Sequence, residues 1–261
     1  NESCGQHALS LIKEKLESGA LHIHKGMLTI VPQANPWACA ASTRYLERNL
    51  NRVIRHHKEP KAYEERIAAQ ITALIDVCDV MIDIHSVSTY CPKPFVFNDN
   101  PTPESNELCQ SLGVGFVVKN WLDMLSEHTT HEFDTTQSYA NTHGKLGCVI
   151  ECGQHQDKNS TDFALLAVHN AMKLYGLIAG DMEIPEFKGE ILAQKAFIKK
   201  REGQMVSDEW HHLMPVKKAT VIARYDDGEE LAAPDDGYLL LPAHYANIGD
   251  EWFYFGRLGT A

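Results

Sequence analysis

Residues 80–86 read Val-Met-Ile-Asp-Ile-His-Ser, an apolar run that ends by presenting Asp83 and His85. A short apolar run of this kind is typical of a strand buried in a sheet. In an open α/β sheet, ligands bind just beyond the carboxyl ends of the strands. We therefore take His85 as a candidate metal ligand or acid–base group, although a lone histidine after a strand is more often structural.

The first 180 residues alternate between strand and helix patterns. Apolar runs predict strands at 27–31, 78–84, 95–97, 115–119 and 146–151, and helical spacing predicts helices at 5–17, 60–77, 102–112 and 160–178. Residues 33–58 show little periodicity and are predicted to form a loop. Strands that alternate with helices predict an α/β fold with a largely parallel sheet.

The pattern changes after about residue 182. Strand-like segments separated by turn signals follow at 190–199, 219–225, 237–241 and 252–255. They predict a smaller β-rich domain over residues 183–261, which follows a larger domain over residues 1–182.

Length, charge and composition exclude some classes of protein. The 261 residues can bury a sizeable core, and 44% hydrophobic with 23% charged residues is ordinary for a globular protein. The net charge of -11 argues against a nucleic-acid partner, because phosphate recognition needs a basic surface. A small anionic substrate is not excluded, since it needs only a local cluster of arginines.

The cysteines and apolar segments predict a soluble, cytoplasmic protein. Seven cysteines, an odd number without Cys-x-x-Cys spacing, indicate reduced thiols. No apolar stretch approaches the roughly 18 residues that span a bilayer. The first residues also lack the charged-then-apolar order of a signal peptide. We therefore expect no membrane partner.

Polar side chains with useful chemistry follow three of the predicted strands. Residues 35–52 include Arg44, Asn51 and Arg52, and the second cluster is the pair Asp83 and His85. The third is Glu151, which ends the apolar run at 146–151. A carboxylate at the end of a buried strand lies in partly apolar surroundings, which raise its pKa toward that of a general base.

Four motifs occur in a fixed order: Asn35-Pro36 with Arg44, Asn51-Arg52, Asp83-Ile84-His85 and Ile150-Glu151-Cys152-Gly153. In order and separation they resemble the succinylglutamate desuccinylase/aspartoacylase family, the amidohydrolase branch of the zinc carboxypeptidase fold. The resemblance implies an α/β fold with a mixed, carboxypeptidase-like sheet flanked by helices, followed by a smaller C-terminal β-rich domain.

The resemblance also implies a zinc site. Family members carry a His-Gly-Asn-Glu motif whose histidine and glutamate bind zinc, and Asn1-Glu2 resembles its second half. By this resemblance Glu2 and His85 are ligands of one zinc ion per chain. The third ligand would be a histidine two positions before residue 1. Two histidines and a carboxylate leave a fourth position for water, as catalytic zinc sites do.

The same resemblance assigns roles to the remaining residues. Zinc lowers the pKa of a bound water toward about 7. Glu151 is then the general base, which accepts the water proton and later delivers it to the leaving amine. Arg44 stabilises the developing oxyanion. Asn51 and Arg52 bind a carboxylate of the substrate.

These roles predict a zinc-dependent amidohydrolase, or deacylase, acting on a small anionic N-acyl amino acid. The alternatives are a metallocarboxypeptidase acting on peptides and a metal-free pseudoenzyme that binds carboxylates. Asp83 shares a strand face with His85 and fits either a supporting or a purely structural role. Asn49 stands where an aspartate is common in the family. The sequence leaves the acyl group, the amino acid and the oligomeric state open.

Overall fold

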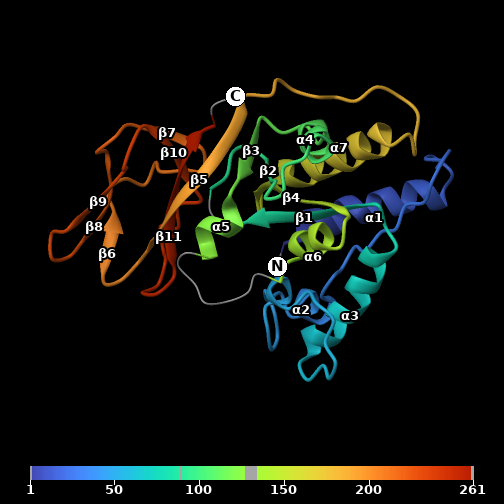
Figure 1. Cartoon of the computed structure of the whole chain (residues 1–261), viewed down its shortest axis with the longest axis horizontal. Coiled ribbons are helices and arrows are strands. Elements are labelled where there is room, and N and C mark those ends of the chain that lie inside the picture. The colour runs from blue at the N-terminus through green and yellow to red at the C-terminus, as the bar shows by residue number, and fades with distance from the viewer. Residues whose placement is uncertain (1, 89, 127–133, 260–261) are drawn as a thin grey trace.

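The chain folds into a helical part and a β-rich part that lie side by side (Figure 1). The structure is a computed structural model, and it describes residues 2–88, 90–126 and 134–259. Within these ranges, no helix is long and apolar enough to cross a membrane. All seven cysteines lie within the described residues and are free thiols.

One eight-stranded mixed sheet runs through both parts. Its strand order is β1(Val80–Val87), β4(Leu146–Gln154), β2(Phe95–Phe97), β3(Phe116–Lys119), β5(Gly189–Ile198), β11(Glu251–Leu258), β10(Gly237–Leu240) and β7(Met214–Val216). The pairs β1–β4, β2–β3 and β3–β5 are parallel, and the others are antiparallel. The sheet is therefore mixed, with β1 at one edge of the described sheet.

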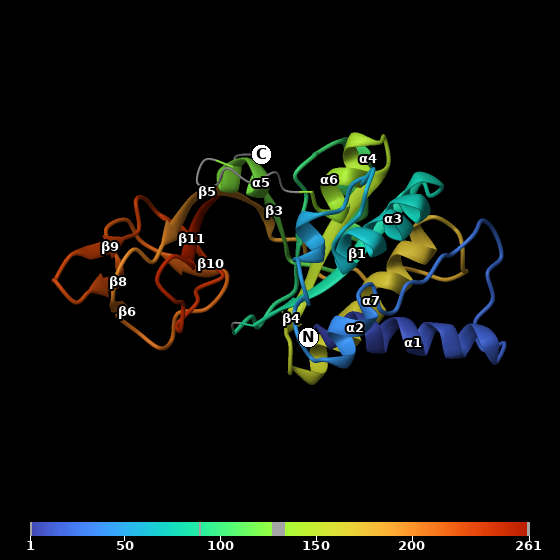
Figure 2. The same cartoon turned by 90° about the horizontal axis from the view of Figure 1, so that it is seen from below.

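Helices cover both faces of the parallel end of this sheet. The helices α1(Ser3–Glu17), α4(Pro103–Ser111) and α7(Lys158–Leu174) pack with β1 and β4 around a shared apolar core. The helices α3(Tyr63–Asp76) and α6(Thr136–Thr142) lie on the other side of β1 (Figure 2). This layering buries β4 on both faces, as its apolar sequence predicts.

The β-rich part adds a second, antiparallel sheet. Its strands are β6(Gly203–Met205), β8(Val221–Tyr225) and β9(Glu230–Ala232), in the order β6-β8-β9. An aromatic core that includes Trp252, Phe253 and Phe255 of β11 lies beneath it. The large sheet continues from the helical part into the β-rich part, and the division of the chain at residues 182 and 183 stays a prediction.

Most of the predicted elements are confirmed, but the strand predicted at 27–31 is wrong. These residues belong to no strand of the described chain. They line a cavity together with residues of β1, and their backbone is paired with no strand of the described sheets. An apolar run becomes a strand only where another backbone satisfies its hydrogen bonds.

Short elements account for the other differences. The predicted loop at 33–58 contains the helix α2(Pro36–Ala40) and the 3-10 turn η1(Leu50–Arg52). The helices α5(Trp121–Ser126) and α6, and the strands β6, β7 and β9, were not predicted. Segments of three to seven residues contain too few apolar positions to establish a period.

Candidate active site

The His85 imidazole lies between two carboxylates. Its Nδ1 is 2.8 Å from Oε2 of Glu2, and its Nε2 is 3.1 Å from Oδ2 of Asp83. The backbone N–H of Ser86 donates to the same Glu2 oxygen at 3.1 Å. Asp83 and His85 lie two residues apart on β1, so both side chains leave the same face of the strand. The strand continues to Val87, which places His85 inside the strand rather than after it.

The charges in this cluster stabilise one another. Burial alone would lower the pKa of His85, but Asp83 and Glu2 raise it well above its ordinary value. Burial opposes the charge of Glu2 too, yet His85 and then Arg44 lower the pKa of Glu2 to about 2. The pKa of Asp83 is lowered by His85 in the same way, against its burial. The cluster therefore holds two ionised carboxylates about a positive centre.

Glu2 reaches His85 because α1 lies very close to β1. Gly5 is in the first turns of α1, and a Cβ atom there would lie only 3.1 Å from Cβ and Cγ2 of Ile84 on β1. Cys4 is buried beside it, and its Sγ donates a long contact to the backbone oxygen of His85 at 3.5 Å. The lack of a side chain at Gly5 thus lets the start of α1, which follows Glu2, lie close to β1.

Arg44 approaches the cluster from the loop that follows α2. Its Nη1 donates to Oε1 of Glu2 at 3.3 Å, and half of its side chain, 51%, stays exposed. The second Glu2 oxygen contacts His85, so one carboxylate joins the arginine to the histidine. An exposed guanidinium beside a buried site can contact both the site and an incoming ligand.

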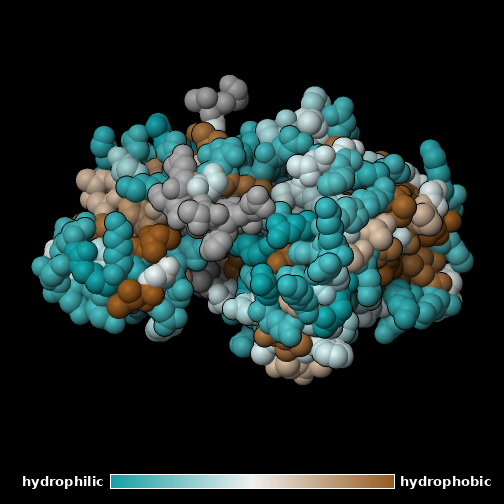
Figure 3. Space-filling model, turned by 60° about the horizontal axis from the view of Figure 1, so that its bottom comes forward, coloured by the Kyte–Doolittle hydropathy of each residue, from teal (hydrophilic) through white to brown (hydrophobic). Residues whose placement is uncertain are grey.

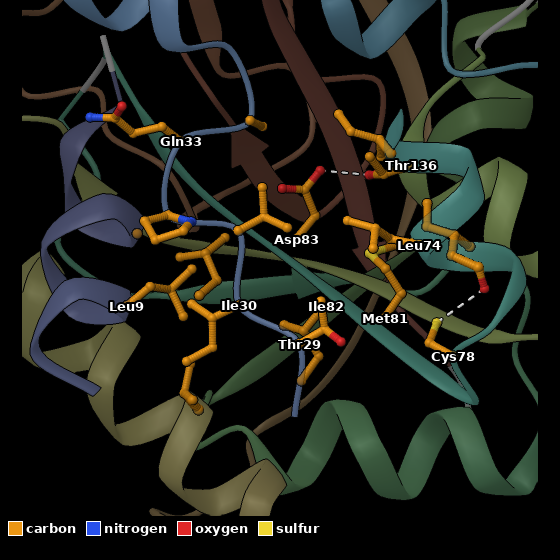
Figure 4. Close-up of a pocket in the computed structure, with 18 of the residues that line it drawn as sticks. Leu9, Thr29, Ile30, Gln33, Leu74, Cys78, Met81, Ile82, Asp83 and Thr136 are labelled. Atoms are coloured by element: carbon orange, nitrogen blue, oxygen red, sulfur yellow. Dashed lines mark hydrogen bonds between the residues drawn. The ribbon is translucent and has the colours of Figure 1, made fainter. Parts of the chain in front are cut away.

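Asn51 and Arg52 belong to η1, and Asn51 is joined to Asp83 through Thr136. The Thr136 N–H donates to Oδ1 of Asn51 at 3.1 Å, and its hydroxyl donates to Oδ2 of Asp83 at 2.6 Å, as Figure 4 shows for the Asp83 contact. Oδ1 of Asn49 accepts the N–H of Asn51 at 3.1 Å. Asn49 thereby caps the turn.

Arg52 lies between the loop and the β-rich part. Its Nη1 donates to the backbone oxygen of Asn51 at 2.7 Å. Burial lowers the pKa of Arg52, and the positive charge of Arg44 lowers it further. Glu251 and Tyr254 of β11 act on the same guanidinium in the opposite direction. The two arginines are therefore close enough to repel each other, which favours an anion near them.

Glu151 lies on β4 beside His85, its register partner on β1. The residue is buried, and its Oε2 has no hydrogen-bond partner within the described part of the chain. Burial raises the pKa of Glu151 to about 8, although His85 opposes this shift. A buried carboxyl group with an unused oxygen needs an explanation, and a proton-transfer group is one.

A cavity of about 700 Å³ extends from this cluster beneath β1. Its walls come from α1, α3, β1 and the extended segment 27–33. Leu9, Ile30, Ile82 and Leu74 line its apolar part, whereas Asp83 points toward Thr136 at its polar end (Figure 4). Apolar surface is also visible on the helical side of the molecule in Figure 3.

The structure brings the predicted site residues together around His85. Glu2 contacts it, Glu151 is its register partner, and Arg44 reaches it through Glu2. Asn51 joins through Thr136 and Asp83, and Arg52 follows Asn51 in η1. Asn1, the other residue of the predicted motif, lies outside the described residues. Sequence reasoning missed Thr136, which lies in a polar helix without apolar spacing, and Glu64, which binds the backbone of the Arg44 loop.

The donor chemistry of Glu2 and His85 fits zinc. A carboxylate oxygen and an imidazole nitrogen are two of the ligand types that zinc prefers, and these two face each other. Asp83 contacts the second ring nitrogen, an arrangement that commonly orients a metal-binding histidine. Within the described ranges, however, no group of three or more His, Cys, Asp or Glu side chains could hold a metal ion.

The family relation is clear from comparison with known proteins. The model of the succinylglutamate desuccinylase/aspartoacylase catalytic domain matches residues 1–174. The chain therefore belongs to this family, which confirms the resemblance seen in its motifs. The family takes its name from deacylating hydrolases, so family membership supports a role as an amidohydrolase. No curated protein matches the chain.

Solved structures confirm the fold. A succinylglutamate desuccinylase/aspartoacylase from Rhodobacter sphaeroides is 16% identical, with a TM-score of 0.80, over 99% of this chain and 82% of that one. A succinylglutamate desuccinylase from a Silicibacter species is 21% identical, with a TM-score of 0.77 and the same coverage. The product-bound ectoine utilization protein EutE (DoeB) from Ruegeria pomeroyi is 20% identical, with a TM-score of 0.79, over 98% of this chain and 81% of that one.

Proposed function

We propose that the protein is a zinc-dependent amidohydrolase that removes the acyl group from an N-acyl amino acid. The observation that carries this proposal is the Glu2 carboxylate, which contacts both His85 and Arg44 beside the buried Glu151. These contacts bring together two groups of a type that binds metal, Glu2 and His85, with the Arg44 guanidinium and the Glu151 carboxyl group. Membership of a family of deacylases supports the same chemistry.

In this proposal Glu2 and His85 hold one zinc ion. The third ligand would be a histidine, as the family resemblance implies. Asp83 accepts a hydrogen bond from Nε2 of His85, and Nδ1 faces the Glu2 carboxylate, so Nδ1 and that carboxylate would be the two groups that hold the ion. When bound, zinc supplies a polarised water whose pKa falls toward about 7.

Glu151 is the proposed proton carrier. Its carboxyl group lies beside His85 on the neighbouring strand, and Oε2 has no competing partner within the described residues. It takes the proton of the attacking water at a carboxylate oxygen and gives it to the nitrogen of the leaving amine. The raised pKa of Glu151, about 8, favours the second of these transfers. A bound zinc ion, as a nearby positive charge, would lower this pKa and so favour the first.

The two arginines are proposed to bind the substrate. Arg44 donates to the carbonyl oxygen as negative charge develops there, and Arg52 with Asn51 binds a carboxylate. The position of Arg52 near Glu251 and Tyr254 supports a contribution from the region 183–261, which we propose as a separate β-rich domain that narrows access. We also propose a cytoplasmic location, consistent with seven free cysteine thiols.

The test uses the full-length protein purified without added chelator. Its zinc content is measured by mass spectrometry, and release of free amine is assayed with N-acyl amino acids and with peptides that carry a free C-terminus. We expect one zinc per chain and hydrolysis of N-acyl amino acids. Preferential cleavage of peptides would indicate a carboxypeptidase, and a protein without zinc or hydrolysis would indicate a carboxylate-binding pseudoenzyme.

A further inference from the structure

A single buried carboxylate holds the backbone of the loop that carries Arg44. Glu64 lies in the first turn of α3 and is fully buried. Its Oε1 accepts the N–H of Leu46 at 2.7 Å, and its Oε2 accepts the N–H groups of Glu47 at 3.3 Å and Arg48 at 3.1 Å. Three consecutive N–H groups therefore converge on one side chain, which fixes the backbone just after Arg44.

The same carboxylate also fixes the backbone before Arg44. Nδ2 of Asn35 donates to Oε1 of Glu64 at 3.2 Å, and Oδ1 of Asn35 accepts the N–H of Ala38 at 3.2 Å as the N-cap of α2. The helix α2 ends at Ala40, four residues before Arg44. Both flanks of the arginine thus depend on Glu64.

The carboxylate is held in its ionised form. Burial alone would raise the pKa of Glu64, but the N–H groups of Leu46 and Arg48 and the Asn35 amide lower it below its ordinary value. Charge-assisted hydrogen bonds of this kind are stronger than those between neutral groups. An amide in place of the carboxylate would put an NH₂ group against the N–H groups that Oε2 now accepts.

The anchored backbone leads directly into the second part of the candidate site. Arg48 precedes Asn49, whose side chain accepts the N–H of Asn51, and Asn51 in turn binds Thr136. A shift of residues 46–48 would therefore move Arg44 on one side and Asn51 with Arg52 on the other. No other carboxylate within the described residues has this set of contacts with the loop.

We propose that Glu64 is the positioning residue that sets Arg44 and the Asn51–Arg52 pair in place for the substrate. The proposal rests on the proposed function of these three residues. Glu64 acts through the loop and does not touch the substrate. A small displacement of a group that orients a substrate lowers the reaction rate by a large factor.

The chain offers a matched control in the next residue. Glu65 also lies in the first turn of α3, and its Oε2 accepts the N–H groups of Lys61 and Ala62. Among the described residues, its contact with the loop at 41–49 is the Arg48 side chain, at 3.5 Å, and it accepts no N–H group of that loop. Glu65→Gln therefore tests the same chemical change in the same helix turn without removing the anchor.

The experiment measures kcat and KM of the full-length, zinc-loaded protein with its best substrate. We expect Glu64→Gln to lower kcat/KM by about 10², and Glu65→Gln to leave it nearly unchanged. In the Arg44→Ala background, Glu64→Gln should lower kcat/KM by less than in the wild type, because only its effect through Asn51 and Arg52 remains. Equal losses of kcat/KM in Glu64→Gln and Glu65→Gln would overturn the proposal. So would an effect of Glu64→Gln on kcat/KM that is the same with and without Arg44→Ala. If Glu64→Gln does not fold, Glu64→Asp replaces it, with an expected loss of about tenfold.

A second measurement does not depend on activity. Arg44 lies in an exposed loop, so trypsin can cleave after it once the loop backbone is released. We expect Glu64→Gln to speed this cleavage well above wild type, and Glu65→Gln not to do so. Unchanged cleavage would reject Glu64 as the anchor even in an active enzyme. Absence of hydrolysis by the wild type would reject the proposed function and leave this measurement valid.

Discussion

Two mostly buried histidines, one in the helical part and one in the β-rich part, lie in opposite surroundings. His85 is flanked by Glu2 and Asp83, which raise its pKa well above the ordinary value. His212 lies against the ring of Phe95, with 4.0 Å between ring centroids. Burial, with a smaller effect from His211, lowers the pKa of His212 to about 3.

The difference teaches how to separate a candidate active site from a structural core. Nδ1 of His212 accepts the N–H of Leu241 at 3.1 Å, so the neutral ring serves as a packing and hydrogen-bonding group. The His85 cluster gathers several charges at one end of a cavity. Such a collection costs free energy to bury, and proteins retain it mostly where charges are used.

The largest expected effect is at Glu151. Glu151→Gln removes the proton carrier and keeps the side-chain volume, so we expect kcat to fall by about 10³- to 10⁴-fold. The same substitution at Glu190, which pairs with Lys119 on neighbouring strands, is the control and should leave kcat nearly unchanged. Full activity of the Glu151 variant, measured as amine release, would reject the proposed mechanism.

Acid should destabilise the protein through His212. The native state holds the ring neutral down to about pH 3, whereas the unfolded state takes up a proton near 6.5. Stability from this group is therefore complete above pH 6.5 and falls as the pH drops toward 3, by up to roughly 5 kcal/mol. The measurement is the free energy of unfolding in urea at several pH values.

The control for this pH effect is His212→Asn, which keeps an acceptor for Leu241 and cannot titrate. The difference in stability between wild type and variant should shrink toward low pH. Asp99 works in the opposite direction, because burial raises its pKa to about 6. Its contribution is present below pH 3.8 and is lost as the pH rises through 6, in both proteins. A difference that does not change with pH would show that the pKa of His212 is the same in the native and unfolded states, contrary to the expected lowering.

A smaller effect is expected at Asp83. Asp83→Asn weakens the contact with Nε2 of His85, and removal of such a partner typically lowers metal affinity or activity by about 10- to 100-fold. Asp79→Asn, an exposed residue just before β1, is the control. Zinc affinity is measured by competition with a chelator, and an unchanged affinity together with unchanged kcat would assign Asp83 a structural role.

The smallest effect is expected on the surface of the β-rich part. Nη1 of Arg257 lies 3.0 Å from Oδ2 of Asp235, and both side chains are at least 40% exposed. Exposed pairs of this kind contribute no more than about 1 kcal/mol. Arg257→Ala should therefore change the free energy of unfolding by less than this amount and leave kcat unchanged. A larger loss would show that this exposed ion pair contributes as much to stability as buried charged groups do.

The part of the candidate site that could be predicted from the sequence consists of residues that follow long apolar runs. His85 and Glu151 stand out because each is a polar or charged residue that follows apolar residues in its strand, β1 or β4. Glu64 and Thr136 could not be found this way, because their partners lie far along the chain. Glu64 binds the backbone 16 to 18 residues before it, and Thr136 contacts Asp83 across 53 residues.

The same limit explains the error at 27–31. Its apolar pattern is as good as that of a real strand, but strand formation depends on a neighbouring backbone that the local pattern does not reveal. The long helices α1, α3 and α7 were predicted because their apolar spacing is a property of the segment itself. Local patterns therefore define helices better than strands, and define single strands better than the contacts between distant loops.

Gly5 has a consequence for how sequence variants of this protein should be read. It carries no functional group, yet one added carbon would meet Ile84 at 3.1 Å, so that α1 or Ile84 must give way by a few tenths of an ångström. Gly5 lies three residues after Glu2, at the same end of α1. A change at Gly5 would therefore act on the position of a site residue, while the chemistry of every side chain in the site stayed intact.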